Sequence, residues 1–490
     1  MNNLLQNIWQ KYHTEFLIFS GTFLVRLIVF GALSYYAVTT GTLSSNIEVR
    51  QYPVIGSDSG GYIATARHML AEGEFASPGA GEPQSYQVPI YPLFLAGVMA
   101  LSGGTTIIIL LQILIAGLSS VLVYKLGSII SHTVGIGSAL LFMVDPISVF
   151  FSTTILTETI FIFFLLLAIY IHMRFFGSLW KGVLLAGIVL GVATLTRPSA
   201  IVLPPIFVLT FLLTHTLPTI KQKLIPMVVF SFGFFLVVFP WLLRNKVLFN
   251  TWELTAVATI QWYDYNAPLF YAQQHNITHT EAKDIFRSRL FEINPYKNND
   301  GTLQNTPYMR QVVYEFLRED PLGYAGFHII KTIPFFVSDG LRDIARRMEL
   351  VGHQPNIGDA VLRFDLPKLQ HILFESGRSS LLLITGSGMW VFITLGMIIS
   401  MLGYRRLNER ARRILLISIL AVFMTMLIAG GPNSSARYRL SISPFMFIAA
   451  AYGLWLFREF LHARFNRTQS LPNVLDKKER EIKRISDKEI

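Results

Sequence analysis

Long apolar segments alternate with a few polar ones along this chain. Apolar runs of roughly 20 residues, the helix length that crosses a bilayer core of about 30 Å, recur from end to end. We predict spanning helices at about 15–38, 106–126, 134–150, 155–176, 180–196, 199–214, 225–243, 379–403, 411–431 and 439–460. Unpaired backbone is too costly in lipid, and these continuous runs do not resemble barrel strands, so the spans must be helical. The pattern predicts an all-α polytopic membrane protein with about ten transmembrane helices.

Two polar regions interrupt this pattern. The first, 39–105, contains the apolar piece PIYPLFLAGVMAL, which is too short to span and carries two prolines. We expect interfacial or re-entrant helices in this first outer loop. The second region, 244–378, is polar and aromatic with patchy helical periodicity, which predicts a mostly helical extramembrane section with an interfacial helix at 324–337.

Composition and charge agree with a membrane protein and set its orientation. Of 490 residues, 52% are hydrophobic and 14% charged, and the formal net charge is +11. The positive charge crowds 405–413 and the tail at 477–488, whereas 39–105 carries five acids and no lysine. The positive-inside rule makes the former cytoplasmic and the latter outer, and this distribution argues against nucleic acid as a partner. Zero cysteines exclude disulfides and thiolate chemistry.

Four parts follow from this pattern. They are a transmembrane module with the first outer loop (1–243), an extramembrane section (244–378), C-terminal transmembrane helices (379–462) and a basic cytoplasmic tail (463–490).

Two acids at the outer side are candidates for chemistry. Asp58 opens an amphipathic run in GSDSGGYIATARHML, where it is either the N-cap of an interfacial helix or a general base. The two roles are compatible, because a helix N-terminus favours the ionised carboxylate that a base needs. Glu158 lies about one turn into a span, where an acid is costly unless it is paired or lines a polar cavity. Tyr62, on the helix that Asp58 opens, is a candidate substrate contact.

Several basic residues are expected at the same outer boundary. They are Arg197, Arg244, Arg437 and Arg439. Each alone is typical of an interfacial anchor. Together they place several guanidinium groups where the positive-inside rule predicts few, and such groups pair well with phosphate oxygens. Arg26 lies mid-membrane in the first span, where it either snorkels or faces the bundle and pairs with an acid.

Other motifs are absent or weak. The sequence contains no nucleotide-binding glycine loop, no metal-binding histidine spacing and no nucleophile elbow. The sequence is compatible with no cofactor and with a divalent metal ion. Tyr265 and Asn266, in QWYDYNAPL, either line a sugar site or pack a loop. Asp145, which precedes a proline, is typical of a turn.

The chain resembles the C-type glycosyltransferase superfamily, membrane enzymes that take sugars from polyprenyl phosphate carriers. In particular it is similar to the bacterial branch related to protein mannosyltransferases and to the aminoarabinose transferase of lipid A. The matching pieces are SDSGGYIATARHML, VPIYPLFLAG, LTETIFIFFLLLAIY, LTRPSAIVLPP, FPWLLRNKVLF and RYRLSISPFMFIAAAYGL, in this order along the chain. The combination is more specific than any single piece.

The resemblance implies a role for each candidate residue. Asp58 would be the catalytic base, Glu158 would support acceptor or metal binding, and Arg437, in its RYR motif, would hold the carrier phosphate. Many members carry a basic residue shortly before the YPLF segment, where this chain has Gln87. The implied activity is an inverting transfer of a sugar from a polyprenyl phosphate carrier to a lipid, glycan or protein hydroxyl. The implied place is the outer face of a bacterial inner membrane, among membrane lipids.

Two other classes of function stay open. A transporter or lipid flippase also uses intramembrane Arg and Glu, although the long outer section and the absence of an internal repeat are unusual for secondary transport. A noncatalytic assembly subunit would keep the fold and tolerate loss of Asp58.

Overall fold

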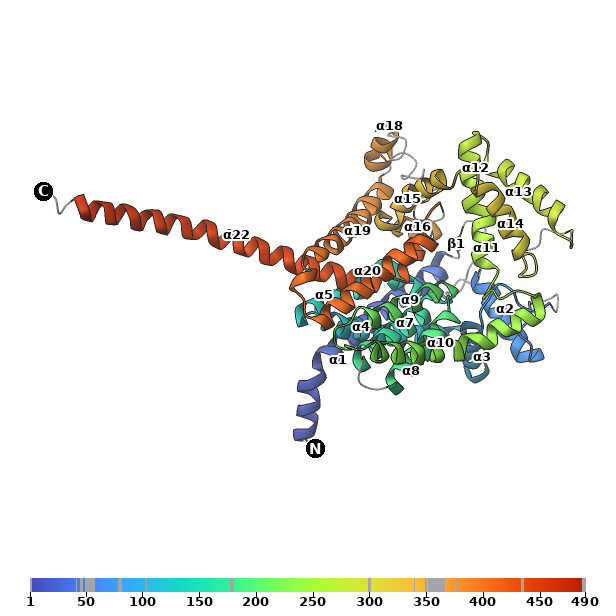
Figure 1. The fold of residues 1–490 in the computed structure, drawn as a ribbon, viewed down its shortest axis with the longest axis horizontal. Coiled ribbons are helices and arrows are strands. Elements are labelled where there is room, and N and C mark those ends of the chain that lie inside the picture. Colours follow the sequence, from blue (N-terminus) through green and yellow to red (C-terminus); the bar gives the residue numbers. More distant parts are fainter. Residues whose placement is uncertain are drawn as a thin grey trace.

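The computed structural model is almost entirely helical (Figure 1). It describes residues 2–40, 42–44, 47–48, 58–77, 82–102, 104–176, 180–297, 301–338, 340–348, 350, 366–375, 377–432 and 436–486. The only strands in this part of the chain are β1 (Thr42–Ser44) and β2 (Ile47–Glu48), which pair with each other. The predicted all-α class is therefore confirmed.

Within the described residues, seven helices are long and apolar enough to cross a membrane. They are α1 (Asn2–Thr40), α4 (Thr105–Gly127), α7 (Glu158–Phe175), α10 (Ile220–Phe249), α19 (Arg378–Leu402), α20 (Glu409–Ala429) and α22 (Ser443–Ser486). An eighth span results if α5 (His132–Val144) and α6 (Pro146–Ser152), bent by 59°, are counted as one. The predicted count of ten is not confirmed, because α8 (Trp180–Thr194) and α9 (Pro204–Leu212) are shorter than a full span.

Glycines allow some of these helices to approach very closely. A Cβ added at Gly187 of α8 would lie 2.2 Å from the carbonyl oxygen of Phe230 in α10. A Cβ added at Gly453 of α22 would lie 1.8 Å from the carbonyl oxygen of Gly396 in α19. Backbone contact of this kind is the way apolar helices gain packing energy where lipid offers no hydrophobic driving force.

The break between α5 and α6 is formed by the sequence Asp145-Pro146. Asp145 caps α6 by accepting a 3.1 Å hydrogen bond from the Ser148 N–H, and Pro146 occupies the first turn of α6. Arg26 of α1 reaches this break and donates to the Ser148 hydroxyl (2.9 Å) and to the Phe142 carbonyl (3.2 Å). Arg26 is fully buried, so it faces the bundle and does not snorkel.

The predicted first outer loop contributes two helices beside the bundle. They are α2 (Asp58–Glu72) and α3 (Ile90–Ser102), which pack on each other, and Ile63 and Ala66 of α2 are buried. Residues 51–57 lie outside the described residues.

A second group of helices stands apart from the spans (Figure 1). It contains α11 (Val257–Gln261), the π-helical turn η2 (Trp262–Asn266), α12 (Ala267–His275), α13 (His279–Ile293) and α14 (Thr306–Leu317). It has its own apolar core, which includes Tyr263, Phe286 and Val312. Helix α15 (Pro321–Val337) then leads back to the bundle and contacts α19.

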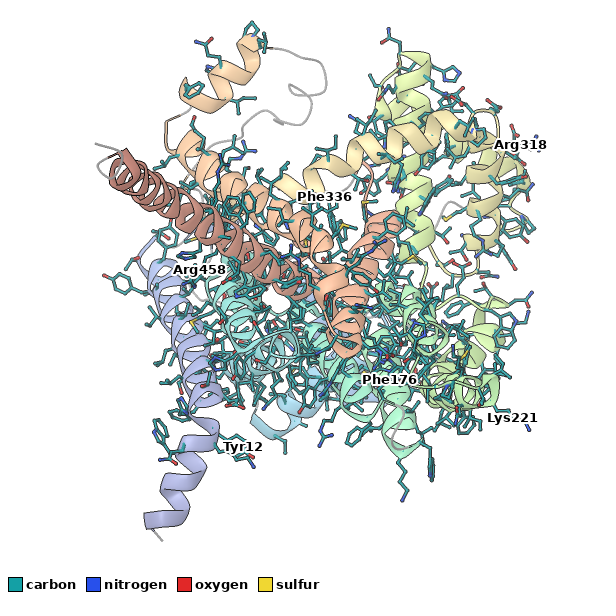
Figure 2. All side chains as sticks on the ribbon, turned by 60° about the vertical axis from the view of Figure 1, so that its left-hand side comes forward. Tyr12, Phe176, Lys221, Arg318, Phe336 and Arg458 are labelled. Atoms are coloured by element: carbon teal, nitrogen blue, oxygen red, sulfur yellow. The ribbon has the colours of Figure 1, made fainter. Side chains whose placement is uncertain are left out.

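The first turn of α10 and the end of α14 lie on different sides of the molecule. Figure 2 shows Phe176, just after α7, and Lys221, in the first turn of α10, on the side away from Arg318, which follows α14. In this view Lys221 therefore lies on the opposite side of the molecule from the end of α14.

Candidate active site

Arg437 connects the two predicted catalytic acids. Its Nη1 lies 2.7 Å from Asp58 Oδ2, and its Nε lies 2.7 Å from Glu158 Oε1. The three residues come from α21 (Ala436–Leu440), α2 and α7, which are far apart in sequence. The fold therefore brings together three residues that the sequence singled out separately.

Arg197 completes this cluster from a fourth segment. Its Nη1 lies 2.8 Å from Glu158 Oε1 and donates to the Thr157 hydroxyl at 3.3 Å. Arg197 precedes η1 (Pro198–Val202), whose first residue, Pro198, cannot continue the hydrogen-bonding of α8. Glu158 thus binds two guanidinium groups through the same carboxylate.

Glu158 lies in a buried position, where an unpaired carboxylate is unfavourable. Its side chain is 0% exposed at the first position of α7, whereas the Asp58 side chain is 51% exposed. Burial of a charge costs several kcal/mol unless it is paired, and the two arginines supply that pairing. The start of α7 adds the favourable end of the helix dipole. Glu158 is consequently a fixed counter-charge, whereas Asp58 is open to solvent and to a ligand.

Helix α2 positions Asp58 at its first turn. Ile63 and Ala66 bury one face of the helix, and the Tyr62 ring packs edge-on against Tyr91 at a centroid distance of 5.0 Å. Burial raises the pKa of Tyr62 to about 12, and the negative charge of Glu158 contributes to the same shift. Tyr62 is therefore a neutral hydrogen-bond donor at physiological pH.

A cavity of about 860 Å³ opens beside this cluster. Asp58, Tyr62, Arg197 and Arg437 line it, and Glu158 lies behind the two arginines. Apolar side chains form much of the remaining wall; they include Val88, Ile201, Leu242, Leu254, Val257 and Ile428. Ile201 and Val257 are more than two-fifths exposed, so part of this wall faces outward. The cavity therefore presents charged groups and apolar surface to one ligand.

Two of the predicted phosphate-binding arginines are engaged elsewhere. Arg244, in α10, donates to the carbonyls of Gln84 (3.0 Å) and Phe75 (3.3 Å) and lies 4.5 Å from the Trp241 ring centroid. Arg439 is fully buried and donates to the Phe335 carbonyl at 2.6 Å. Neither residue lines the cavity.

The predicted aromatic site in the extramembrane section also lies outside the cavity wall. Tyr265 is 41% exposed and contacts the Lys283 ammonium group. Asn266 is fully buried within η2. Neighbouring residues Gln261 and Trp262 do line the cavity. Tyr265 and Asn266 therefore lie outside the cavity wall, although two residues of the same segment are part of it.

Other residues of the cavity wall were not anticipated. Glu253 lines the cavity, and its carboxylate accepts hydrogen bonds from Thr259 (2.9 Å), Thr306 (2.6 Å) and Arg310. These partners come from α11 and α14, so Glu253 ties both helices to the segment that follows α10. No local pattern distinguishes Glu253 from other loop acids, because Thr306 and Arg310 are 53 and 57 residues away in sequence.

A divalent metal ion does not fit the side chains at this site. Among the described residues, no group of three or more His, Cys, Asp or Glu side chains could hold a metal. Asp58 and Glu158 are the two predicted acids here, and both bind guanidinium groups that a cation would have to displace. Asp58 and Glu158 therefore supply no set of metal ligands here.

Residues 83–243 match the family of dolichyl-phosphate-mannose-protein mannosyltransferases. This match confirms, over that segment, the resemblance to the C-type glycosyltransferases. The segment contains Glu158 and Arg197 but not Asp58 or Arg437. No curated protein matches the chain.

Two solved structures of the Archaeoglobus fulgidus oligosaccharyltransferase are similar. The structure tethered to an acceptor peptide has 11% identity and a TM-score of 0.46, over 93% of this chain and 51% of that one. The complex with Zn and sulfate has 14% identity and a TM-score of 0.39, over 82% and 45%. The chain spans about half the length of these solved chains.

Proposed function

We propose that this protein is an integral membrane glycosyltransferase that inverts the anomeric carbon. It moves a sugar from a polyprenyl phosphate carrier to a hydroxyl of a lipid, glycan or protein acceptor. The observation that supports this most strongly is Arg437, which lies between an exposed acid, Asp58, and a buried one, Glu158, at the wall of a large cavity. The similarity of residues 83–243 to the mannosyltransferase family supports the same reaction class.

The donor phosphate binds to Arg437 and Arg197. Both guanidinium groups line the cavity and are oriented by Glu158, so they are positioned before the donor arrives. The apolar wall near Ile201 and Val257 receives the first part of the polyprenyl chain. A ligand with one charged group on a long apolar tail satisfies both kinds of surface.

Asp58 accepts the proton in the transfer step. When the phosphate binds Arg437, it competes with Asp58 for that guanidinium group and frees the carboxylate, which is already half exposed. The acceptor hydroxyl oxygen then attacks the anomeric carbon while the bond from that carbon to the phosphate oxygen breaks. The bonding pair stays with the polyprenyl phosphate, and the hydroxyl proton moves to Asp58. One displacement inverts the anomeric carbon.

The arginines favour this step because negative charge grows on the phosphate as the sugar leaves. Fixed guanidinium groups in a partly dry cavity stabilise that charge without reorganising. The proposed setting is the outer face of a bacterial inner membrane, with the extramembrane helices on the acceptor side. Glu253 keeps those helices against the cavity through Thr306 and Arg310.

The experiment separates transfer from transport. Purified protein in lipid vesicles receives a panel of polyprenyl phosphate sugars labelled in the sugar, with membrane extract as acceptor. Label in a new glycosidic product, with an inverted anomeric centre, supports the proposal. Movement of intact labelled carrier between leaflets without a new glycoside would favour the flippase alternative and contradict it.

A further inference from the structure

A second pocket lies at the opposite end of α7 from the candidate active site. Its volume is about 310 Å³. It is lined by side chains of Glu15, Tyr124, Lys125, Ser128, Ile129, Tyr170, Met173, Arg174 and Arg410. Glu158 begins α7, and Arg174 lies in its last turn. At a rise of about 1.5 Å per residue, the two positions are about 24 Å apart along the helix axis, close to the thickness of a bilayer core.

Four separate helices meet at this pocket. Lys125 lies in the last turn of α4, Arg410 in the first turn of α20 and Glu15 in α1, in addition to Arg174 of α7. All four belong to helices long enough to span a membrane. In a bilayer spanned by these helices, the pocket would lie at the headgroup region, on the face opposite the active-site cavity.

The side chains that line this pocket carry more positive than negative charge. Lys125 and Glu15 neutralise each other through a 2.9 Å ion pair. Arg174 and Arg410 are both exposed, and neither forms an ion pair with any carboxylate of the described residues. Glu409, the acid next to Arg410, instead binds Arg413 and the Thr214 hydroxyl. Two guanidinium groups thus line one small pocket without a counter-charge.

The chemistry that fits is a phosphate group. Guanidinium groups bind phosphate oxygens with paired, charge-assisted hydrogen bonds, and the Tyr124 and Tyr170 side chains in the pocket carry hydroxyl groups. Ile129 and Met173 add apolar surface to the pocket. The acyl chains of a lipid can pack on this surface, whereas free phosphate cannot. We propose that this pocket binds the phosphate group of an anionic lipid headgroup. The site is separate from the proposed transfer reaction and does not depend on it.

A general excess of positive charge on this face is the competing explanation. Arg405 and Arg406 provide the matched control, because both are exposed on the loop before α20 and neither lines the pocket. The test compares wild type with Arg174→Gln/Arg410→Gln and with Arg405→Gln/Arg406→Gln, which remove the same charge. Each full-length protein, purified in detergent, is titrated with phosphatidylglycerol, phosphatidylcholine or inorganic phosphate. Bound lipid is counted by native mass spectrometry, and the melting temperature is recorded in parallel.

We expect one phosphatidylglycerol to bind wild type and the control variant with equal affinity and to raise the melting temperature of both. The pocket variant should bind it at least about tenfold more weakly, because two charge-assisted contacts are lost. Its melting temperature without lipid should equal that of wild type, which shows that it folds. If inorganic phosphate reproduces the stabilisation and displaces the lipid, the site holds, but its ligand is free phosphate. Equal losses in the two variants, or equal binding of phosphatidylcholine, would overturn the proposal.

Discussion

Arg437 and Arg439 lie two positions apart on α21, but their side chains contact different parts of the molecule. Arg437 points to the cavity and binds Asp58 and Glu158, whereas Arg439 is fully buried, with its guanidinium 3.5 Å from the Trp390 ring centroid. Arg439 also donates to the carbonyls of Phe335 and Ser338 at the end of α15. The short helix is therefore fixed to α15 and α19 on one side and carries the phosphate-binding candidate on the other.

The first prediction concerns Arg439, which fixes α21 to α15 and α19. Arg439→Lys keeps the charge but loses the planar group that stacks on Trp390 and donates to two carbonyls. We expect a loss of about 2–4 kcal/mol in stability, because these contacts are buried. The melting temperature of the purified protein measures this. A variant as stable as wild type, but with a raised KM for the donor, would return Arg439 to the role of phosphate ligand.

The second prediction concerns the buried counter-charge. Glu158→Gln leaves Arg197 and Arg437 without the carboxylate that both contact. We expect about 3 kcal/mol of destabilisation, because breaking a buried ion pair leaves uncompensated charge. We also expect a lower kcat, since the guanidinium groups lose their orientation. Thermal unfolding and turnover are both recorded; normal stability together with normal turnover would show that Glu158 orients neither arginine.

The third prediction concerns Arg437 itself. Arg437→Gln removes a charge that stabilises the departing phosphate, so kcat should fall by about 10²–10³-fold. Arg67→Gln is the control, because Arg67 is exposed on α2 and does not line the cavity. Transfer rates at saturating donor are compared for the two variants. Similar rates would mean that Arg437 holds the structure together and does not act on the phosphate.

The fourth prediction separates a structural arginine from a binding one. Arg244 donates to the carbonyls of Gln84 and Phe75 in the first outer loop and packs on Trp241. We expect Arg244→Gln to lower stability by about 2–3 kcal/mol through the loss of these charged hydrogen bonds. The KM for the donor should stay near the wild-type value. The opposite result, a large rise in KM at unchanged stability, would assign Arg244 to the phosphate.

Much of the fold could be predicted from the pattern of apolar segments. That pattern located the long apolar helices and the turn at Asp145, because helix length and caps are local properties. It did not give the span count, since α8 and α9 are apolar throughout but too short. Apolar character alone does not distinguish a full span from a short buried helix.

The site could be predicted in part. Asp58 stood out because it opens an amphipathic run and matches the acid of the resembled family, and Glu158 because an acid is rare at membrane depth. Arg197 and Arg437 stood out because the positive-inside rule predicts few basic residues at the outer boundary, and the structure brings all four residues together. The same argument could not separate Arg437 from Arg439, because both are arginines on one short segment and only tertiary contacts determine which faces the cavity. Glu253, Gln261 and Trp262 were missed for a related reason: nothing in the local sequence marks them, and only the tertiary fold, as in the hydrogen bond from Thr306 to Glu253, places them at the wall.

The most direct test compares wild type with Asp58→Asn at matched folding. Both are purified in lipid and given polyprenyl phosphate sugars labelled in the sugar, with membrane extract as acceptor. Loss of the exposed carboxylate removes the proton acceptor without touching a buried contact, so transfer should fall by about 10²–10⁴-fold while the melting temperature changes little. Equal transfer by both proteins would contradict the assignment of Asp58 as the base and, with it, the proposed mechanism.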